Sequence, residues 1–115
     1  MININIIDGK LINFYEELKN DLRLLGCGPT QLKIDDNSNL SGNITIGDND
    51  AFNEYDILNI LTRHSAYFKV EVTKDSYNGY QLFSDFIWDG KILIQLHKDK
   101  FGSIYEIEYC NWILD

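Results

Sequence analysis

The acidic side chains of this chain are concentrated in one stretch. Six acids and no lysine or arginine lie between Lys33 and Arg63. Carboxylates grouped in this way can ligate a metal ion, attract a basic protein, or serve turns and helix ends on a solvated surface. The acids are Asp35, Asp36, Asp48, Asp50, Glu54 and Asp56.

The spacing of these acids does not match a calcium-binding loop. An EF-hand loop needs a glycine at its sixth position and a glutamate at its twelfth. Counted from Asp48, these positions hold Asn53 and Asn59, and counted from Asp35 the sixth position holds Leu40. We therefore expect no metal site and no cofactor here.

Residues that could bind zinc or act as nucleophiles are far apart in the chain. They are Cys27, Cys110, His64 and His97, without CxxC or HxxxH spacing, and the chain has no GxSxG or P-loop motif. We expect both cysteines to be buried free thiols, His64 to stabilise a helix C-terminus and His97 to be exposed on a strand. The prediction is that the protein is not an enzyme. A small enzyme using His64, His97 and nearby acids is the alternative of another class.

The totals define a small acidic domain. The chain has 115 residues, a formal net charge of −8, 44% hydrophobic residues and 13% aromatic residues, which suits one domain spanning residues 1–115. Its charge repels nucleic acid and anionic membranes, so we expect no direct binding to either. The first ten residues do not resemble a signal peptide, and we expect a cytoplasmic protein of a bacterial or phage genome. Its oligomeric state stays open.

The first half of the chain reads as strands alternating with two helices. Residues 2–6 alternate like a strand, and Asp8-Gly9 reads as a turn. Asn13 is predicted to cap a helix that starts at residue 10 or 12 and ends at 25, although residues 10–15 could instead pair with the first strand. Short strands are expected near 30–35 and 42–47, and Asn53 is expected to cap a second helix over 52–64.

The second half reads as an antiparallel meander of about four strands. These strands are predicted within 66–73, 80–88, 91–97 and 103–113, and Asp89-Gly90 is a strong hairpin signal. Together the patterns predict an α+β fold, with a mainly antiparallel sheet covered by two helices.

A concentrated negative surface beside a capped helix favours protein binding. Such a surface steers a basic partner, and aromatic side chains supply the buried anchors of an interface. Tyr55 is predicted at the centre, with Tyr67, Tyr77 and Trp88 as further exposed aromatics. The predicted partner-binding residues are Asp35, Asp36, Asp48, Asp50, Glu54, Tyr55 and Asp56, extended by Glu106 and Glu108 on the last strand.

This profile of size, charge and missing catalytic motifs resembles the small acidic immunity proteins that bacteria pair with secreted toxins, including those of contact-dependent growth inhibition systems. The resemblance covers the whole chain as a profile, without a shared motif. It implies a stoichiometric inhibitor that binds a cognate basic toxin, often a nuclease. Small acidic anti-CRISPR proteins and other phage-encoded mimics of DNA fit the same profile, and an assembly module is a third class.

Overall fold

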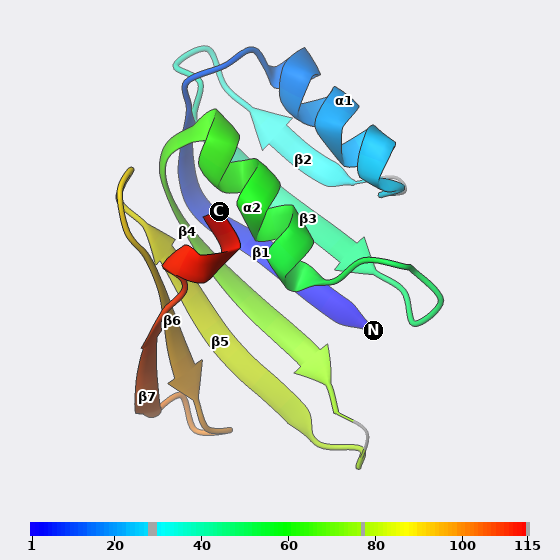
Figure 1. Cartoon of the computed structure of the whole chain (residues 1–115), viewed down its shortest axis with the longest axis vertical. Helices are drawn as coiled ribbons and strands as arrows, with labels where there is room; N and C mark the ends of the chain where they lie inside the picture. Colours follow the sequence, from blue (N-terminus) through cyan, green and yellow to red (C-terminus); the bar gives the residue numbers. More distant parts are fainter. Residues whose placement is uncertain (28–29, 77, 115) are drawn as a thin grey trace.

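The N-terminal strand lies in the interior of a seven-stranded antiparallel sheet (Figure 1). The computed structural model describes residues 1–27, 30–76 and 78–114. The strands lie in the order β2-β3-β1-β4-β5-β6-β7. In chain order the elements are β1 (Ile2–Leu11), α1 (Tyr15–Leu25), β2 (Gln31–Ile34), β3 (Leu40–Ile46), α2 (Glu54–His64), β4 (Ser65–Asp75), β5 (Gln81–Trp88), β6 (Leu93–Lys98), β7 (Ile104–Tyr109) and the short 3-10 helix η1 (Asn111–Leu114).

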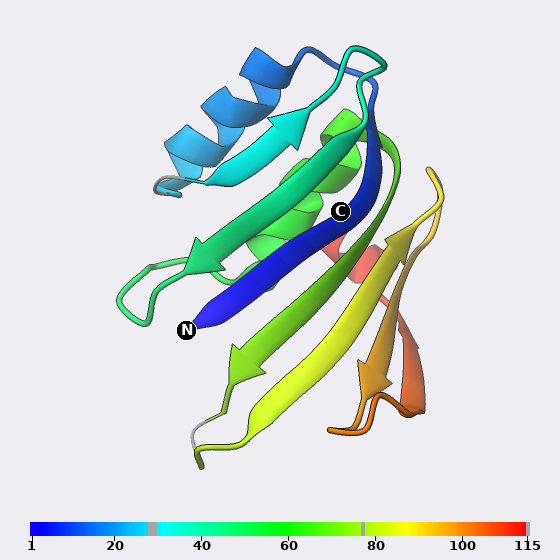
Figure 2. The ribbon, with the colours of Figure 1, turned by 180° about the vertical axis from the view of Figure 1, so that it is seen from behind.

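The predicted α+β class is confirmed, with a C-terminal meander formed by β4 to β7. Both α-helices lie on one face of the sheet, and the view from behind shows the other face bare of the described helices (Figure 2). Alternate strand residues such as Ile4, Ile44, Val70 and Phe86 are fully buried on the helix-bearing face. The helices contribute Leu18 and the Ile57–Leu61 stripe to the same core.

The prediction of a turn at Asp8-Gly9 is wrong, because β1 runs through it. The pairing of β1 with β4 shifts register between Ile6 and Asp8, so Ile7 is an extra, exposed residue. A bulge of this kind reverses which residues face the core, and Gly9 and Leu11 are buried beyond it. In the sequence, this break in the alternation of buried and exposed residues, together with the Asp-Gly pair, looks like the end of a strand.

The predicted start of the first helix is also wrong. Residues 10 and 11 belong to β1 and do not form a hairpin partner for it, and α1 starts at Tyr15. Asn13 does not cap the helix, since its amide donates to the Arg63 carbonyl (3.4 Å) and lies 3.0 Å from Nδ1 of His64.

The second helix forms as predicted. Asn53 Oδ1 accepts hydrogen bonds from the backbone N–H groups of Tyr55 (3.0 Å) and Asp56 (3.2 Å). In return, Asp56 Oδ2 accepts from the N–H of Asn53 at 2.8 Å, which completes a capping box.

Two expectations near the C-terminus need correction. Trp88 is buried, with 8% exposure, and its indole N–H donates to the Ser65 carbonyl at 2.9 Å. The last strand ends at Tyr109, and η1 packs on α2 through a hydrogen bond from Asn59 to the Ile113 carbonyl. Tyr67 is exposed as expected, whereas Tyr77 lies outside the described residues. None of the described helices is long and apolar enough to span a membrane.

Candidate partner-binding cleft

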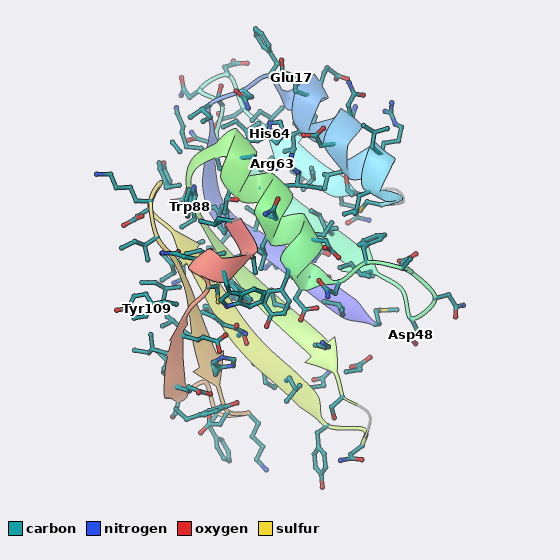
Figure 3. All side chains as sticks on the ribbon, in the orientation of Figure 1. Glu17, Asp48, Arg63, His64, Trp88 and Tyr109 are labelled. Atoms are coloured by element: carbon teal, nitrogen blue, oxygen red, sulfur yellow. The ribbon has the colours of Figure 1, made fainter. Side chains whose placement is uncertain are left out.

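The structure divides the acidic stretch between two ends of a strand. Asp35 and Asp36 lie in the turn between β2 and β3, and Asp48 and Asp50 follow the far end of β3. A seven-residue strand is about 20 Å long, so these two pairs do not form one patch. Figure 3 shows Asp48 at the right-hand edge of the molecule, on the loop that follows β3.

Several of these acids have roles within the chain. Asp35 accepts hydrogen bonds from the side-chain amide and backbone N–H of Asn39, and these bonds lower the pKa of its carboxyl group. Asp48 pairs with the terminal ammonium of Met1, and this contact raises the pKa of that ammonium. Asp50 accepts from the N–H of Gly47 at 2.7 Å, and Asp56 completes the cap of α2. Turn and capping geometry therefore accounts for Asp35, Asp50 and Asp56, and an ion pair with the Met1 ammonium accounts for Asp48.

Two of the other predicted residues, Glu54 and Tyr55, line one cavity on the helix-bearing face, whereas Asp36 does not. The cavity has a volume of about 170 Å³ and lies beside the N-terminus of α2, where the ends of β4, β5 and β6 extend beyond the helices (Figure 1). Glu106 and Glu108 pair with His97 and Gln95, so they share this face of the sheet. We call this cavity the α2 cleft; its wall includes Glu54, Tyr55, Lys74, Gln95, His97 and Tyr105.

Glu54 is the buried acid of the α2 cleft. Its exposure is only 6%, and it lies in the first turn of α2, where the helix dipole favours a negative charge. Oε1 accepts from Nζ of Lys74 at 3.3 Å, whereas Oε2 is buried and has no hydrogen-bond partner among the described residues. The carboxylate is therefore only half satisfied.

A small polar network holds Tyr55 in place. Its hydroxyl donates to Oε1 of Gln95 at 3.3 Å, and Nε2 of Gln95 donates to Ser84 Oγ at 3.0 Å. The Tyr55 ring packs edge-on against Phe86 and tilted against Trp112, with centroid distances of 6.0 and 5.2 Å. Burial, and then the charge of Glu54, raise the pKa of the Tyr55 hydroxyl, so Tyr55 stays neutral.

Cys110 lies behind the same network. It is fully buried, and its Sγ is 3.6 Å from Oε1 of Gln95 and 3.7 Å from Oε2 of Glu108. Burial, followed by the negative charge of Glu108, raises the pKa of this thiol to about 11. Cys110 is thus a protonated, buried structural thiol, as expected. Cys27 is also a free cysteine, but it is half-buried rather than buried.

His97 is less exposed than the sequence suggests. A bulge in β7 places the Tyr105 ring 6.1 Å from the imidazole, and Nε2 of His97 is buried without a partner among the described residues. His97 therefore adds a second unsatisfied polar atom to the wall that contains Glu54.

The two histidines do not share a site. His64 is at the C-terminal end of α2, as Figure 3 shows, and its Nε2 is 2.6 Å from Oδ2 of Asp21. The eleven-residue helix, about 16 Å long, separates it from the α2 cleft. His64 was expected to stabilise the end of α2; in the structure its buried ring also contacts Asp21 of α1. In the described part of the chain, no three His, Cys, Asp or Glu residues group as metal ligands.

The fold and the cleft assign the protein to a structural class only. It is an α+β domain whose helices leave part of an antiparallel sheet uncovered. No family model matches this chain, and no curated protein or solved structure matches it significantly.

Proposed function

We propose that this protein is a stoichiometric inhibitor that binds a basic protein through the α2 cleft and its acidic rim. The supporting observation is that Glu54 and Tyr55 line one concave site, and that Glu106 and Glu108 pair with two further residues of its wall, His97 and Gln95. Their carboxylates attract cationic groups, and the exposed rings of Tyr105 and Trp112 supply apolar area. An immunity protein for a toxin nuclease is the role that fits best, and a phage-encoded mimic of DNA is the alternative.

This proposal moves the binding surface from the loops to the cleft. Asp35, Asp36, Asp48 and Asp50 contribute to the general negative field of the molecule, which speeds the approach of a basic protein. Close contacts are made instead by residues on α2 and β7. The net charge of −8 predicts an association rate that falls steeply as salt is added.

The test uses the partner protein that the tagged protein captures from its native cell. The captured partner is purified before binding is measured. The double variant Glu106→Lys/Glu108→Lys should weaken the equimolar complex by at least about a hundredfold, since each close charge pair contributes on the order of 1.5 kcal/mol or more. The matched control, Glu17→Lys/Asp36→Lys, has the same net charge and alters exposed acids outside the cleft. Equal weakening by the two double variants would show that only overall charge matters and would refute the site.

A specific observation favours one second function. Glu54 Oε2 and His97 Nε2 are both buried beside one cavity without partners in residues 1–27, 30–76 and 78–114, as in sites where a small molecule exchanges a proton. Against this, His97 has no hydrogen bond to a carboxylate among the described residues, so nothing there orients it as a base. Turnover that His97→Gln abolishes, with equimolar inhibition absent, would favour this enzyme function.

A further inference from the structure

The α2 cleft contains a buried carboxylate that its own chain does not fully satisfy. A buried carboxylate oxygen without a donor is costly, and such atoms are rare in folded proteins. Oε2 of Glu54 is such an atom in a residue that is 94% buried, because its exposure is 6%. Oε2 of Glu54 is therefore free to accept a hydrogen bond from a donor on a bound partner.

Lys74 is a poor partner for Glu54. Its ammonium is a single point of charge that reaches only Oε1, at 3.3 Å, and its side chain is 42% exposed. A pair of this kind is weakly held, and the ammonium can move into water without leaving a buried charge of its own. Lys74 can therefore give way to a better donor.

A guanidinium group has the donor geometry that matches this carboxylate. Its planar fork presents two parallel N–H donors, which satisfy both oxygens of one carboxylate, and it also stacks on aromatic faces. Tyr55 and Tyr105 form part of the cavity wall, and the volume of about 170 Å³ equals that of about five or six water molecules. Glu106 and Glu108 pair with His97 and Gln95 of the cavity wall, so their negative charge lies on the same face of the sheet.

We infer that the α2 cleft receives one arginine side chain of the partner, which displaces Lys74 and binds both oxygens of Glu54. This inference deepens the proposed function and rests on it, because the arginine belongs to the inhibited protein. The ion pair between Lys74 and Glu54 then exists only in the unbound protein and breaks when the partner binds.

The first experiment measures binding to the pocket alone. The probe is N-acetyl-arginine methylamide, titrated into the isotopically labelled protein by NMR, and the control probe is the citrulline analogue, which has the same shape and no charge. We expect shifts around Glu54 and Gln95 with the arginine probe, and at least about tenfold weaker binding of the citrulline probe. Equal binding of both probes, or none by the arginine probe, would overturn the inference.

Variants of Glu54 and Lys74 then test the roles of the two residues. Glu54→Gln should weaken the arginine probe about tenfold, whereas Glu71→Gln, an exposed residue on the other face of the sheet, should not change it. Lys74→Met should tighten binding, because the competing ammonium is gone. Lys74→Arg should weaken it, since the new guanidinium fills the cleft from within. If Lys74→Arg binds the probe like wild type, Lys74 does not compete with the arginine for Glu54. Because Lys74→Arg keeps the positive charge, this test stands even where Lys74→Met folds poorly.

The same variants separate the two proposals when the captured partner is used. A complex that Glu106→Lys/Glu108→Lys weakens and Glu54→Gln leaves intact would retain the proposed function and refute the arginine site. Binding of the arginine probe without any equimolar protein complex would retain the pocket and refute the inhibitor.

Discussion

At the residue scale, a hydrogen-bonded group of three side chains around the buried His64 joins the two helices. Asn13 Nδ2 lies 3.0 Å from Nδ1 of His64, and Nε2 of the same ring lies 2.6 Å from Oδ2 of Asp21. With Asn13 donating to Nδ1, the Nε2–H donates to Asp21. These contacts connect the segment after β1, the middle of α1 and the end of α2, so they contribute to stability at a distance from the α2 cleft.

We expect Asp21→Asn to lower the free energy of unfolding by about 1–2 kcal/mol, because the buried imidazole N–H loses a charged acceptor. Urea unfolding followed by circular dichroism measures this change. Glu17→Gln, an exposed residue on the same helix, should change it by less than about 0.5 kcal/mol. If both variants unfold at the same urea concentration, the Asp21–His64 contact contributes nothing.

The polar side chains of the α2 cleft are less completely hydrogen-bonded than those around His64. Around His64 both ring nitrogens lie within hydrogen-bonding distance of a side chain, whereas Glu54 and His97 each have one buried atom with no partner in the described part of the chain. Stability alone favours full pairing, so unpaired polar groups concentrate where a ligand completes them. Ser65 Oγ, at the C-terminal end of α2, is also buried without a partner among the described residues, so what distinguishes the N-terminal end is the cavity beside the charged carboxylate of Glu54.

At the scale of elements, α2 positions the cleft. Its capping box sets where the helix starts, and this start places Glu54 and Tyr55 in the first turn above β4 and β5. The buried stripe of Ile57, Leu58 and Leu61 then fixes which side of the helix faces the sheet. A change at the cap should therefore affect both stability and the cleft.

We predict that Asn53→Ala lowers the free energy of unfolding by about 1 kcal/mol, because two backbone N–H groups lose their acceptor. It should also weaken the arginine probe, since the first turn then frays. Thermal unfolding and NMR titration measure the two effects. Asn78→Ala, which changes an exposed asparagine between β4 and β5, serves as the control and should alter neither. An unchanged midpoint in Asn53→Ala would mean that the capping box is not needed.

For the whole molecule, buried acidic groups with raised pKa values predict sensitivity to alkali. The ordinary pKa of a cysteine thiol is 9.0, and that of Cys110 is raised to about 11. Between these values the unfolded thiol loses its proton while the folded one keeps it, so the folded state binds more protons and its stability falls as the pH rises. The Tyr55 hydroxyl, also raised, acts in the same direction above pH 10.

The expected loss from Cys110 between pH 9 and 11 is on the order of 2–3 kcal/mol. Urea unfolding midpoints recorded across this range measure it. Cys110→Ala should flatten the dependence, whatever its effect on stability at neutral pH. Tyr80→Phe, at an exposed tyrosine, should keep the wild-type slope. A slope that Cys110→Ala leaves unchanged would assign the alkaline loss to other groups.

Local patterns in the sequence determined the class of fold and most of its elements. Alternation placed Phe68, Val70 and Val72 on one buried face, and Asn53 with Asp56 marked the start of α2. These features depend on neighbours a few residues apart, so the sequence displays them directly. The sequence did not reveal the bulge at Ile7, because a bulge and a strand end both break the alternation of buried and exposed residues.

Only the tertiary structure decided which charges meet. The pairing of β1 between β3 and β4 and the length of β3 separate Asp35 and Asp36 from Asp48 and Asp50, although all four lie close in sequence. The sheet order and the position of α2 bring Glu54 to Lys74 and to the strands that carry His97 and Glu108. Secondary structure follows from local periodicity, whereas a binding site follows from pairing between distant strands, whose order no short window of sequence contains.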